Sequence, residues 1–593
     1  MAVPRFWRAV MRLAGVAALV LLSCAATAAA RSTHHSTSRA NRQLIADSHR
    51  LVSTSASIPA LPGACAALAT NPALVSLRYP TAISSTSVVD PSNAAPGNPS
   101  YCDVQGMIAP QTHFEMKLPL TDWQGRYLQN GCGGYCGTIS QQNFPTCDAT
   151  LGGDFAMATD DEGHTSSGGL GGGGLWAFNS QKLRDEYGYQ SEHELRVVAQ
   201  TILTDFYGQP PQHSYFDGCS DGGREAMNEA ERYPADFNGI IAGAPEIIAG
   251  PLNAENQTWD VRVNTDASGN AILTDNLLPY LHDAVLAACA NDDGTSDGII
   301  TDPQACSLKL NQILQSVTCP STEFGGCLTP LQAMVARDIY DGPSDPQGRL
   351  LYPGGMPLGS EMGWSVFELP PSFSGGSVPT TESLDYFGLS LPYLRFQLLP
   401  LGQLGPDPFQ WQFTDQDFYS MFPVANTWDA MSTDLRAFYH DGGKLLMWQG
   451  WGDNGIPPSG TVDYYDTLSQ RMGSNTSKFA RLFLFPGVYH CGGGYISSSF
   501  DVVFPMVQWV ENGTAPSQIV ASDTLANKST VTRPVYPYPE IPKYDGNGAD
   551  PSTAASFHPV TSSNPAYTNW LGNYLFFEPV GGGHQWGGRG FGD

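Results

Sequence analysis

One short segment, Gly218 to Gly223, has the residue types and the spacing of a nucleophile elbow. It reads Gly-Cys-Ser-Asp-Gly-Gly, a G-x-S-x-G pattern that presents a serine hydroxyl at a sharp turn. The glycines on either side of Ser220 have no Cβ, so the incoming and outgoing backbone can approach closely. A plain Gly/Ser turn would look the same. The pattern indicates a nucleophile only where a strand precedes it and a helix follows.

The flanking residues provide that context. Residues 213–217 predict a short β-strand, and residues 224–233 predict a helix that ends before Pro234. The N-terminus of such a helix places a partial positive charge beside the serine hydroxyl. We therefore take Ser220 as the candidate nucleophile.

Two later strands end in a carboxylate and an imidazole. The apolar run 445–448 predicts a buried strand followed by Asp453, and residues 481–485 predict a second strand followed by His490. Functional groups in open α/β sheets gather at such strand ends. The chain order serine, aspartate, histidine is that of α/β-hydrolases. His164 is a rival base, but a lone histidine in a glycine-rich loop is more often structural.

A cysteine adjoins both the candidate nucleophile and the candidate base. Cys219 precedes Ser220, and Cys491 follows His490. If these cysteines form a disulfide, their Cα atoms lie within about 7 Å, and those of Ser220 and His490 lie within about 15 Å. The chain-entropy model assigns a bridge over so long a loop on the order of 5 kcal/mol. Such a bridge would hold nucleophile and base together.

A glycine-rich turn, residues 131–137, follows another predicted strand and reads Gly-Cys-Gly-Gly-Tyr-Cys-Gly. Backbone N–H groups of Gly133 or Gly134, together with that of Asp221, are candidates for an oxyanion hole. The turn lacks the spacing of nucleotide-binding loops. A tight turn without a ligand is the alternative. Its cysteines, Cys132 and Cys136, could stiffen it, with Cys147 as a competing partner.

The α/β pattern is interrupted by residues 247–424, which are rich in proline, glycine and aromatic side chains and predict an inserted lid domain. Within the lid, the carboxylates of Asp293 and Asp297 alternate with the backbone carbonyls of Thr295 and Ile299, an arrangement that suits Ca²⁺. The loop lacks the glutamate of an EF-hand. An acidic surface turn is the alternative.

Arg395 and its aromatic neighbours lie near the end of the predicted lid. Residues 392–396 and 411–413 could line a pocket for an aromatic substrate, with Arg395 meeting a substrate carboxylate. Burial of these aromatic residues in the lid core and a salt bridge within the lid are the alternatives.

The N-terminus predicts export. Residues 1–30 read as a signal peptide with an apolar run at 13–22 and cleavage after Ala30, with a lipid-modified Cys24 as the alternative. We expect a secreted or periplasmic protein with a flexible leader at 31–60. Eleven of the twelve cysteines then remain, mostly as disulfides, and the odd count predicts one free thiol or one pairing outside the chain.

The composition is that of a large globular protein. With 593 residues, 41% of them hydrophobic, the chain can form a catalytic domain, at 61–246 and 425–593, around the inserted lid. We expect the tail from about residue 547 to be loosely structured. The net charge of −27 argues against nucleic acid or an anionic membrane surface as a partner. No later stretch has the ~18 apolar residues of a membrane helix. The oligomeric state is undetermined.

These motifs together resemble the tannase and feruloyl esterase family, which also contains the enzyme that hydrolyses mono(2-hydroxyethyl) terephthalate. The family's Cys-Ser, Asp and His-Cys signature matches Cys219-Ser220, Asp453 and His490-Cys491. The resemblance covers most of residues 65–515. Further matches are Trp123-x-Gly125-Arg126, Gly133-Gly134, Gly222-Gly223-Arg224, Arg232-Tyr233-Pro234, Gly243-Ala244-Pro245, Gly442-Gly443-Lys444-Leu445 and Pro457-Pro458.

The resemblance implies an α/β-hydrolase core, a lid inserted between serine and aspartate, and a calcium site in the lid. Ala290 stands where the family has its first calcium-binding aspartate, and Asp292 is a possible substitute. Gln449 stands where the family usually has histidine, and we expect that change not to touch the triad. The implied disulfides are Cys65 with Cys102, Cys289 with Cys306, and Cys319 with Cys327.

The expected function is that of a serine carboxylesterase that acts on small aromatic esters without an organic cofactor. Hydroxycinnamic and gallic esters are the preferred class, because plant polyphenol esters are the family's broad substrates, and a terephthalate monoester is the alternative. A catalytically silent, calcium-stabilised binding protein on a hydrolase scaffold is a different class. The presence of Ser220, Asp453 and His490 together favours the enzyme.

Overall fold

The computed structural model describes residues 57–90, 98–139, 144, 154–166, 173–320, 325–372, 380–381, 384–494, 499–524, 529–562 and 569–576. The predicted signal peptide, almost all of the predicted leader, Cys147 and the chain from residue 577 lie outside the described residues. Across the described ranges, no helix combines the length and the apolar character needed to cross a membrane.

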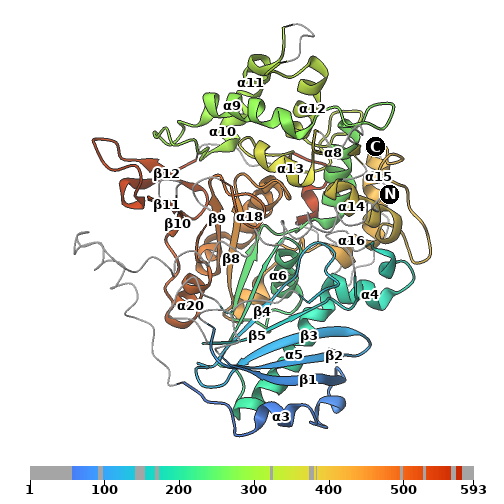
Figure 1. Ribbon diagram of the computed structural model, residues 1–593, viewed down its shortest axis with the longest axis vertical. Helices are drawn as coiled ribbons and strands as arrows, with labels where there is room; N and C mark the ends of the chain where they lie inside the picture. Colours follow the sequence, from blue (N-terminus) through green and yellow to red (C-terminus); the bar gives the residue numbers. More distant parts are fainter. Residues whose placement is uncertain are drawn as a thin grey trace, which may run out of the picture.

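A mixed sheet of nine strands forms the centre of the molecule, in the order β1-β2-β3-β5-β4-β6-β7-β8-β9 (Figure 1). The strands β1, β2, β3 and β5 pair antiparallel, whereas β5, β4 and β6 to β9 pair in parallel. Their bounds are β1 (Thr81–Val89), β2 (Tyr101–Ile108), β3 (Thr112–Pro119), β4 (Arg126–Asn130), β5 (Phe155–Asp160), β6 (His213–Cys219), β7 (Gly239–Gly243), β8 (Lys444–Gly450) and β9 (Ala480–Phe485).

Alternate residues of the parallel strands enter two hydrophobic cores, one on each face of the sheet. Ile240 of β7 belongs to the core that α5, α6 and α18 share, whereas its neighbour Ile241 belongs to the core of α20. Because successive side chains of a strand point to opposite faces, a strand covered on both sides must be apolar throughout. The core helices are α3 (Ala64–Leu68), α4 (Gln181–Asp185), α5 (Ser191–Tyr207), α6 (Asp221–Arg232), α17 (Arg436–His440), α18 (Pro458–Met472), α19 (Thr476–Phe479) and α20 (Val503–Asn512).

The chain between β7 and β8 contains the residues that we predicted as a lid, and α9 to α12 stand at the opposite end of the molecule from β1 to β3 (Figure 1). The lid has its own hydrophobic core, which includes Leu281, Val335 and Trp364. Its limits at residues 247 and 424 stay predictions. The helical segments are α7 (Ala249–Pro251), η7 (Leu252–Gln257), α8 (Thr258–Val263), α9 (Leu278–Cys289), α10 (Pro303–Ser307), α11 (Leu310–Val317), α12 (Pro330–Asp341), α13 (Trp364–Phe367), α14 (Asp385–Pro392), η11 (Tyr393–Gln397), α15 (Asp415–Ser420) and α16 (Phe422–Trp428).

The chain after residue 518 forms two antiparallel strand pairs, and only the last of their strands lies in the tail from about residue 547 that we expected to be loosely structured. The strands β10 (Ile519–Thr524) and β11 (Thr530–Val535) form one hairpin, and β12 (Glu540–Tyr544) pairs with β13 (Phe557–Thr561). Beyond these hairpins, Trp570 donates its indole N–H to Asp463 of α18 at 2.7 Å. Such long-range contacts leave no periodic pattern, so a composition rich in glycine and proline concealed them.

Candidate active site

Ser220 stands at a strained turn between β6 and α6. Its φ of 70° lies in the left-handed region that residues other than glycine rarely adopt. A Cβ at Gly218 would lie 2.3 Å from the carbonyl oxygen of Gly222, and one at Gly222 would lie 2.8 Å from that of Cys132. Both positions therefore require glycine. The predicted strand, turn and helix around the serine are confirmed.

The base and the acid reach Ser220 from the loops that follow β9 and β8. His490 Nε2 lies 2.8 Å from Ser220 Oγ, and His490 Nδ1 lies 3.0 and 3.2 Å from the two carboxylate oxygens of Asp453. Asp453 is fully buried and accepts the backbone N–H groups of Gly455 and Ile456 at 2.9 Å each. This is the geometry of a nucleophile, its base and a carboxylate that orients the base.

Gln449 touches the triad, so the expectation that this change lies apart from it was wrong. Its Nε2 donates to Asp453 Oδ2 at 3.2 Å and to the Ile456 carbonyl at 2.7 Å. The loop after β8 folds back on the end of the strand, which brings the side chain of Gln449 against a carboxylate four residues later. The amide thus helps to hold the carboxylate that orients His490.

Disulfides join the segments that carry the nucleophile and the base. Cys219 is bonded to Cys491, with their Cα atoms 6.0 Å apart, as predicted. The structure also confirms the bridges that the resemblance implied. The remaining pairs are Cys65–Cys102, Cys289–Cys306, Cys319–Cys327 and Cys132–Cys136, the last of which the sequence left open.

A pocket of about 460 Å³, part of it open to solvent, lies in front of Ser220. Of the residues proposed for the oxyanion hole, Gly134 lines this pocket and Asp221 begins α6 beside the serine. The oxyanion hole stays a prediction. The lining residues are Gly134, Tyr135, Ser220, Glu246, Leu252, Asn253, Gln257, Phe367, Tyr386, Leu389, Gly455, Ile456 and His490.

Sequence reasoning missed the polar wall of this pocket. Glu246, Asn253 and Gln257 follow β7; Glu246 is the last residue that we assigned to the catalytic domain before the lid, and the other two lie at the start of the segment that we assigned to the lid. The available signal was the position of Glu246, which directly follows the family segment Gly243-Ala244-Pro245.

Two residues that the sequence singled out have other contacts. The guanidinium of Arg395 donates to the Gly405 carbonyl at 2.8 Å and pairs with Asp407 at 3.3 Å. It thus forms the alternative salt bridge within the lid and is not among the described residues that line the pocket. His164 is buried and stacks on Trp176, with 4.1 Å between ring centroids, whereas His490 is the histidine bonded to the serine.

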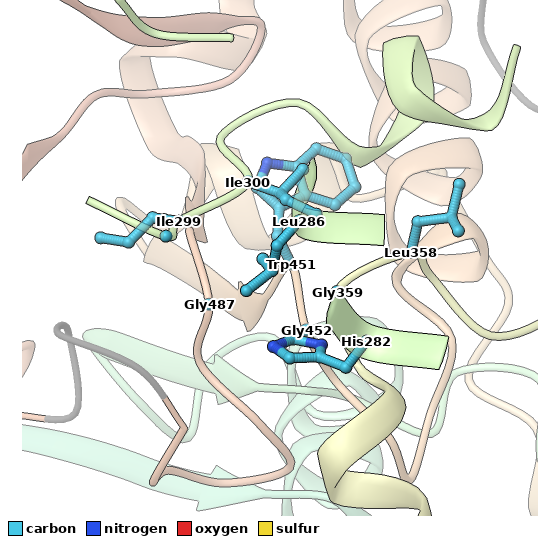
Figure 2. A pocket seen from close by; sticks show the side chains of 10 residues that line it. His282, Leu286, Ile299, Ile300, Leu358, Gly359, Trp451, Gly452 and Gly487 are labelled. Carbon is cyan, nitrogen blue, oxygen red and sulfur yellow. The ribbon is translucent and has the colours of Figure 1, made fainter. Parts of the chain in front are cut away.

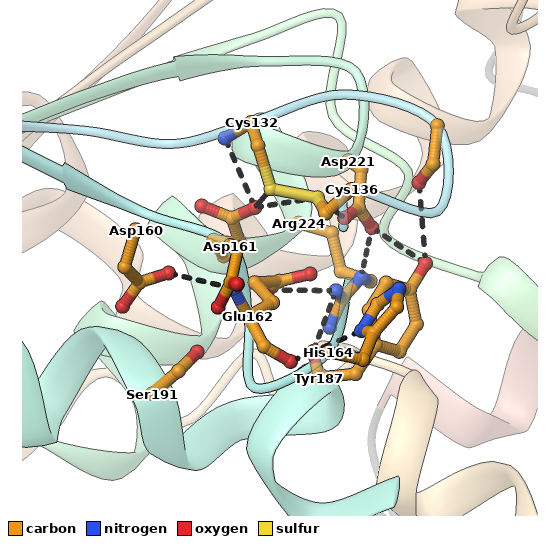
Figure 3. Close-up of a disulfide and its surroundings, with 12 residues drawn as sticks. Cys132, Cys136, Asp160, Asp161, Glu162, His164, Tyr187, Ser191, Asp221 and Arg224 are labelled. Carbon is orange, nitrogen blue, oxygen red and sulfur yellow. Dashed lines mark hydrogen bonds and ion pairs between the residues drawn. A yellow bond between two sulfur atoms is a disulfide. The ribbon is translucent and has the colours of Figure 1, made fainter. Parts of the chain in front are cut away.

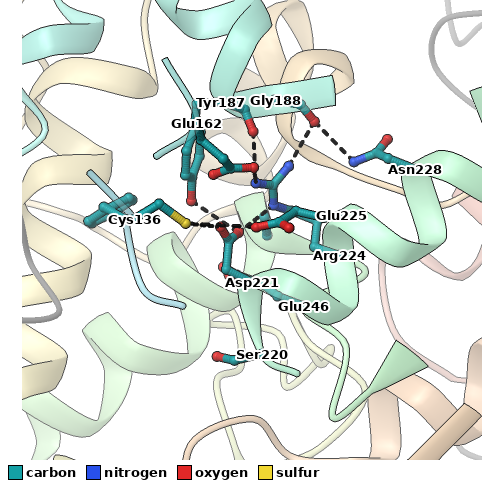
Figure 4. A network of polar contacts seen from close by, with 12 residues as sticks. Cys136, Glu162, Tyr187, Gly188, Ser220, Asp221, Arg224, Glu225, Asn228 and Glu246 are labelled. Carbon is teal, nitrogen blue, oxygen red and sulfur yellow. Dashed lines mark hydrogen bonds and ion pairs between the residues drawn. The ribbon is translucent and has the colours of Figure 1, made fainter. Parts of the chain in front are cut away.

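Behind the nucleophile, the buried guanidinium of Arg224 organises a network of polar contacts (Figure 4). Its Nε lies 2.5 Å from Asp221 Oδ1, and one terminal nitrogen lies 3.3 Å from Glu162 Oε1. The two terminal nitrogens also donate to the carbonyls of Gly188 and Tyr187 at 2.7 and 2.9 Å. Because its donors are satisfied, the arginine anchors the first turn of α6 next to Ser220.

The loop proposed for the oxyanion hole rests on this network (Figure 3). The Cys132 carbonyl accepts the N–H of Gly222 at 2.9 Å. The Cys132 sulfur lies 3.1 Å from Glu225 Oε1, and the Cys136 sulfur lies 3.2 Å from Asp221 Oδ2. These contacts dock the loop and its disulfide against Asp221 and Glu225 at the start of α6.

The same cluster could hold a metal ion. The side chains of Cys132, Cys136, Glu162, Asp221 and Glu225 each offer one ligand atom, and these atoms lie within 4.8 Å of one another. The two sulfurs, however, are joined in a disulfide, and a guanidinium already pairs with two of the carboxylates. With the disulfide formed, the guanidinium of Arg224 supplies the positive charge among these carboxylates.

The pKa values of carboxyls around the network are raised. Burial, and secondly the negative charge of Asp221, raise the pKa of Glu225 to about 7 and that of Glu246 to about 8. Both groups therefore carry protons at pH values where an exposed glutamate is ionised.

In the loop that we predicted to bind calcium, the carboxylates already have partners within the protein. The Asp297 carboxylate pairs with Arg533 of β11, and Asp293 Oδ1 accepts the backbone N–H of Thr295 at 2.7 Å. The possible substitute, Asp292, accepts two backbone N–H groups. These residues do not fit a calcium site built from all four predicted ligands, because an arginine supplies the cation.

The end of this loop packs near the catalytic acid. Ile299 and Ile300 line a mostly apolar hollow together with Trp451 and Gly452, the residues that precede Asp453 (Figure 2). The lid loop therefore supports the turn that carries the acid.

The parallel strands with helices on both faces, the strained serine after β6 and the chain order of Ser220, Asp453 and His490 are those of an α/β-hydrolase with a serine triad. A family model described as "Tannase and feruloyl esterase" matches residues 97–560. The chain belongs to this family of carboxylic ester hydrolases.

Relatives with assigned names support the same placement. A mono(2-hydroxyethyl) terephthalate hydrolase of Piscinibacter sakaiensis is 30% identical over 550 residues, which cover 81% of this chain and 89% of the relative. A probable feruloyl esterase of Arthroderma benhamiae is 31% identical over 465 residues, 74% of this chain and 81% of the relative. The structure of feruloyl esterase B from Aspergillus oryzae shares the fold with a TM-score of 0.69 at 23% identity, covering 84% of this chain and all of that one.

Removal of the Cys132–Cys136 bridge will lower kcat more than it changes KM, because the loop that carries Gly133 and Gly134 loses its constraint. We expect the Cys132→Ser/Cys136→Ser variant to lose about tenfold in kcat on a small ester, part of what a lost oxyanion donor costs. The matched control, Cys319→Ser/Cys327→Ser, removes another short bridge, in the lid, and should keep its kcat. Equal losses in both variants would contradict this role.

The free energy of unfolding will fall as pH rises. Glu225 and Glu246 lose their protons near pH 4.5 when unfolded but only near pH 7 and 8 when folded. Their contribution to stability is therefore full below pH 4.5 and is lost as pH rises through the folded pKa values. Thermal melts between pH 5 and 9 measure this effect, and Glu225→Gln should flatten the slope. A slope that Glu225→Gln leaves unchanged would contradict the assignment.

Chelation of calcium will leave the melting temperature unchanged, because Arg533 neutralises Asp297. Thermal melts with EDTA and with added CaCl₂ test this, and Arg533→Leu should lower the melting temperature by leaving a carboxylate unpaired. A loss of several degrees in EDTA, reversed by CaCl₂, would show instead that the loop binds calcium.

Proposed function

We propose that the protein is an exported serine carboxylesterase that hydrolyses esters of aromatic acids through an acyl-enzyme. The observation that carries the proposal is the contact of 2.8 Å between Ser220 Oγ and His490 Nε2, with Asp453 behind the imidazole, in a chain of this family. A binding protein on a hydrolase scaffold would not need all three groups in reacting geometry.

In the proposed mechanism, His490 accepts the proton of Ser220 as the serine oxygen attacks the ester carbonyl. Asp453 stabilises the imidazolium, and backbone N–H groups of Asp221 and of Gly133 or Gly134 bind the oxyanion, typically worth ~3 kcal/mol per donor. Cleavage of the ester C–O bond follows, with His490 giving its proton to the leaving alcohol. Water then attacks the acyl-enzyme with the same base, and the acid product and free Ser220 result. None of these steps uses an organic cofactor or the predicted lid calcium.

Feruloyl or galloyl esters are the acyl class that we propose. Support comes from the family description and from the probable feruloyl esterase of Arthroderma benhamiae. The relative from Piscinibacter sakaiensis supports a terephthalate monoester as the alternative. Against that alternative, Arg395, our candidate to bind the free carboxylate, pairs with Asp407 in the lid.

We also propose that the enzyme acts outside the cytoplasm, secreted or periplasmic, after cleavage behind Ala30. The five disulfides among the described residues support this location, because such bridges persist in oxidising compartments. N-terminal sequencing of the exported protein tests the cleavage site, and retention of residues 1–30 would contradict it.

Ser220→Ala will abolish hydrolysis of methyl ferulate and methyl gallate while leaving the melting temperature unchanged. The loss should exceed about a thousandfold in kcat, because no other group forms the acyl-enzyme. Labelling with a fluorophosphonate probe should disappear in this variant and persist in Ser296→Ala, which changes an exposed serine of the lid. Turnover by Ser220→Ala, or an unlabelled wild-type protein, would contradict the assignment.

A further inference from the structure

The pocket in front of Ser220 has one polar wall, formed by Glu246, Asn253 and Gln257. The backbone N–H of Glu246 donates to the Ser220 carbonyl at 3.2 Å, so the wall begins beside the nucleophile. Asn253 and Gln257 lie on η7 (Leu252–Gln257), a π-helical segment. Such segments are rare and are frequent at functional sites.

The wall contains an acceptor that the described protein does not use. Gln257 is only 3% exposed, and its Oε1 has no hydrogen-bond partner among the described residues. An unpaired buried acceptor costs about 1–3 kcal/mol, which a donor on a bound substrate would offset. Beside it, Asn253 Nδ2 donates to Glu246 Oε1 at 2.6 Å and thereby holds the carboxyl in place.

The other walls of the pocket present mostly apolar surface to the aromatic ring of a substrate. Leu252, Phe367 and Ile456 line them. The hydroxyls of the two lining tyrosines are already engaged, since Tyr135 donates to the Leu389 carbonyl at 2.6 Å and Tyr386 donates to the Gly455 carbonyl at 2.8 Å. Polar recognition of a substrate ring therefore falls to the wall of Glu246, Asn253 and Gln257.

The described lining of the pocket contains no lysine or arginine. Arg224 and Arg395 pair with carboxylates elsewhere. A substrate carboxylate would thus find no cation among the described lining residues and would lose its water without an opposite charge to replace it, which disfavours its binding.

On the basis of the proposed esterase function, we propose that Glu246, Asn253 and Gln257 recognise hydroxyl groups on the aromatic acyl group, and so select uncharged phenolic esters over esters with a free carboxylate. A phenolic O–H donates to Gln257 Oε1. Burial and the charge of Asp221 raise the pKa of Glu246 to about 8, so its carboxyl can also donate to a ring oxygen at neutral pH.

Two matched pairs of esters test this selectivity. Methyl p-coumarate and methyl cinnamate differ by one hydroxyl, and dimethyl and monomethyl terephthalate differ by one free carboxylate. We expect kcat/KM to favour the first member of each pair by about tenfold or more, since a polar site rejects analogues that leave its groups unpaired. Enzyme concentration is set by fluorophosphonate labelling, so that only folded active sites are counted.

Variants then assign the selectivity to residues. Gln257→Leu should reduce the coumarate-to-cinnamate ratio about tenfold, whereas the ratio for the terephthalates should persist, because the described lining still offers no cation. Gln257→Met, closer in shape, serves if the leucine variant does not label. The control, Gln304→Leu, removes another buried glutamine amide of the lid, outside the pocket lining, and should change neither ratio.

The outcomes separate the two proposals. Wild-type ratios near one, or a coumarate-to-cinnamate ratio that Gln257→Leu and Gln257→Met leave unchanged, would overturn the hydroxyl-recognition wall while leaving the esterase function intact. Absence of both turnover and labelling in the wild type would overturn the esterase function itself.

Discussion

The disulfide between Cys219 and Cys491 is the constraint on which the active site depends. It joins positions 272 residues apart, one before the nucleophile and one after the base. Parallel pairing of β6 to β9 already brings these loops to the same edge of the sheet. Strand pairing alone, however, does not place two side chains within hydrogen-bond distance of each other. His490 stands before the glycines 492–494, so its loop has little intrinsic stiffness. The covalent bond restricts that loop to the region where the imidazole can reach Ser220.

A second layer of constraint lies behind the serine, where Arg224 serves several carboxylates and carbonyls at once. Buried ion pairs add little net stability, but they define geometry because each partner is costly to leave alone. Here the geometry is that of the first turn of α6 and of the loop that carries Gly134, which are held against each other. The raised pKa values of Glu225 and Glu246 follow first from burial and then from the negative charge of Asp221. Strain and buried charge of this kind concentrate at functional sites.

The lid does more than cover the site. It has its own hydrophobic core and supplies Phe367, Tyr386 and Leu389 to the pocket. Tyr386 also donates to the Gly455 carbonyl in the loop of the catalytic acid, and Asp297 connects the lid to β11 through Arg533. Chemistry and selectivity are therefore divided: strand ends of the sheet carry the reacting groups, and the chain after β7 carries the surfaces that meet the substrate. That division is how one fold serves many substrates.

The sequence by itself determined the strands that precede the reacting residues, the triad and the bridge between Cys219 and Cys491, because each has a local signal: an apolar run, a polar residue at its end, a cysteine beside it. Only the tertiary structure decided that Arg395 pairs with Asp407, that Gln449 contacts Asp453, that Arg533 takes the place expected for a cation at Asp297, and that Glu246, Asn253 and Gln257 share one wall. Side-chain direction in loops and in an inserted lid has no period along the chain. Packing against distant segments sets it, and those contacts exist only once the chain has folded.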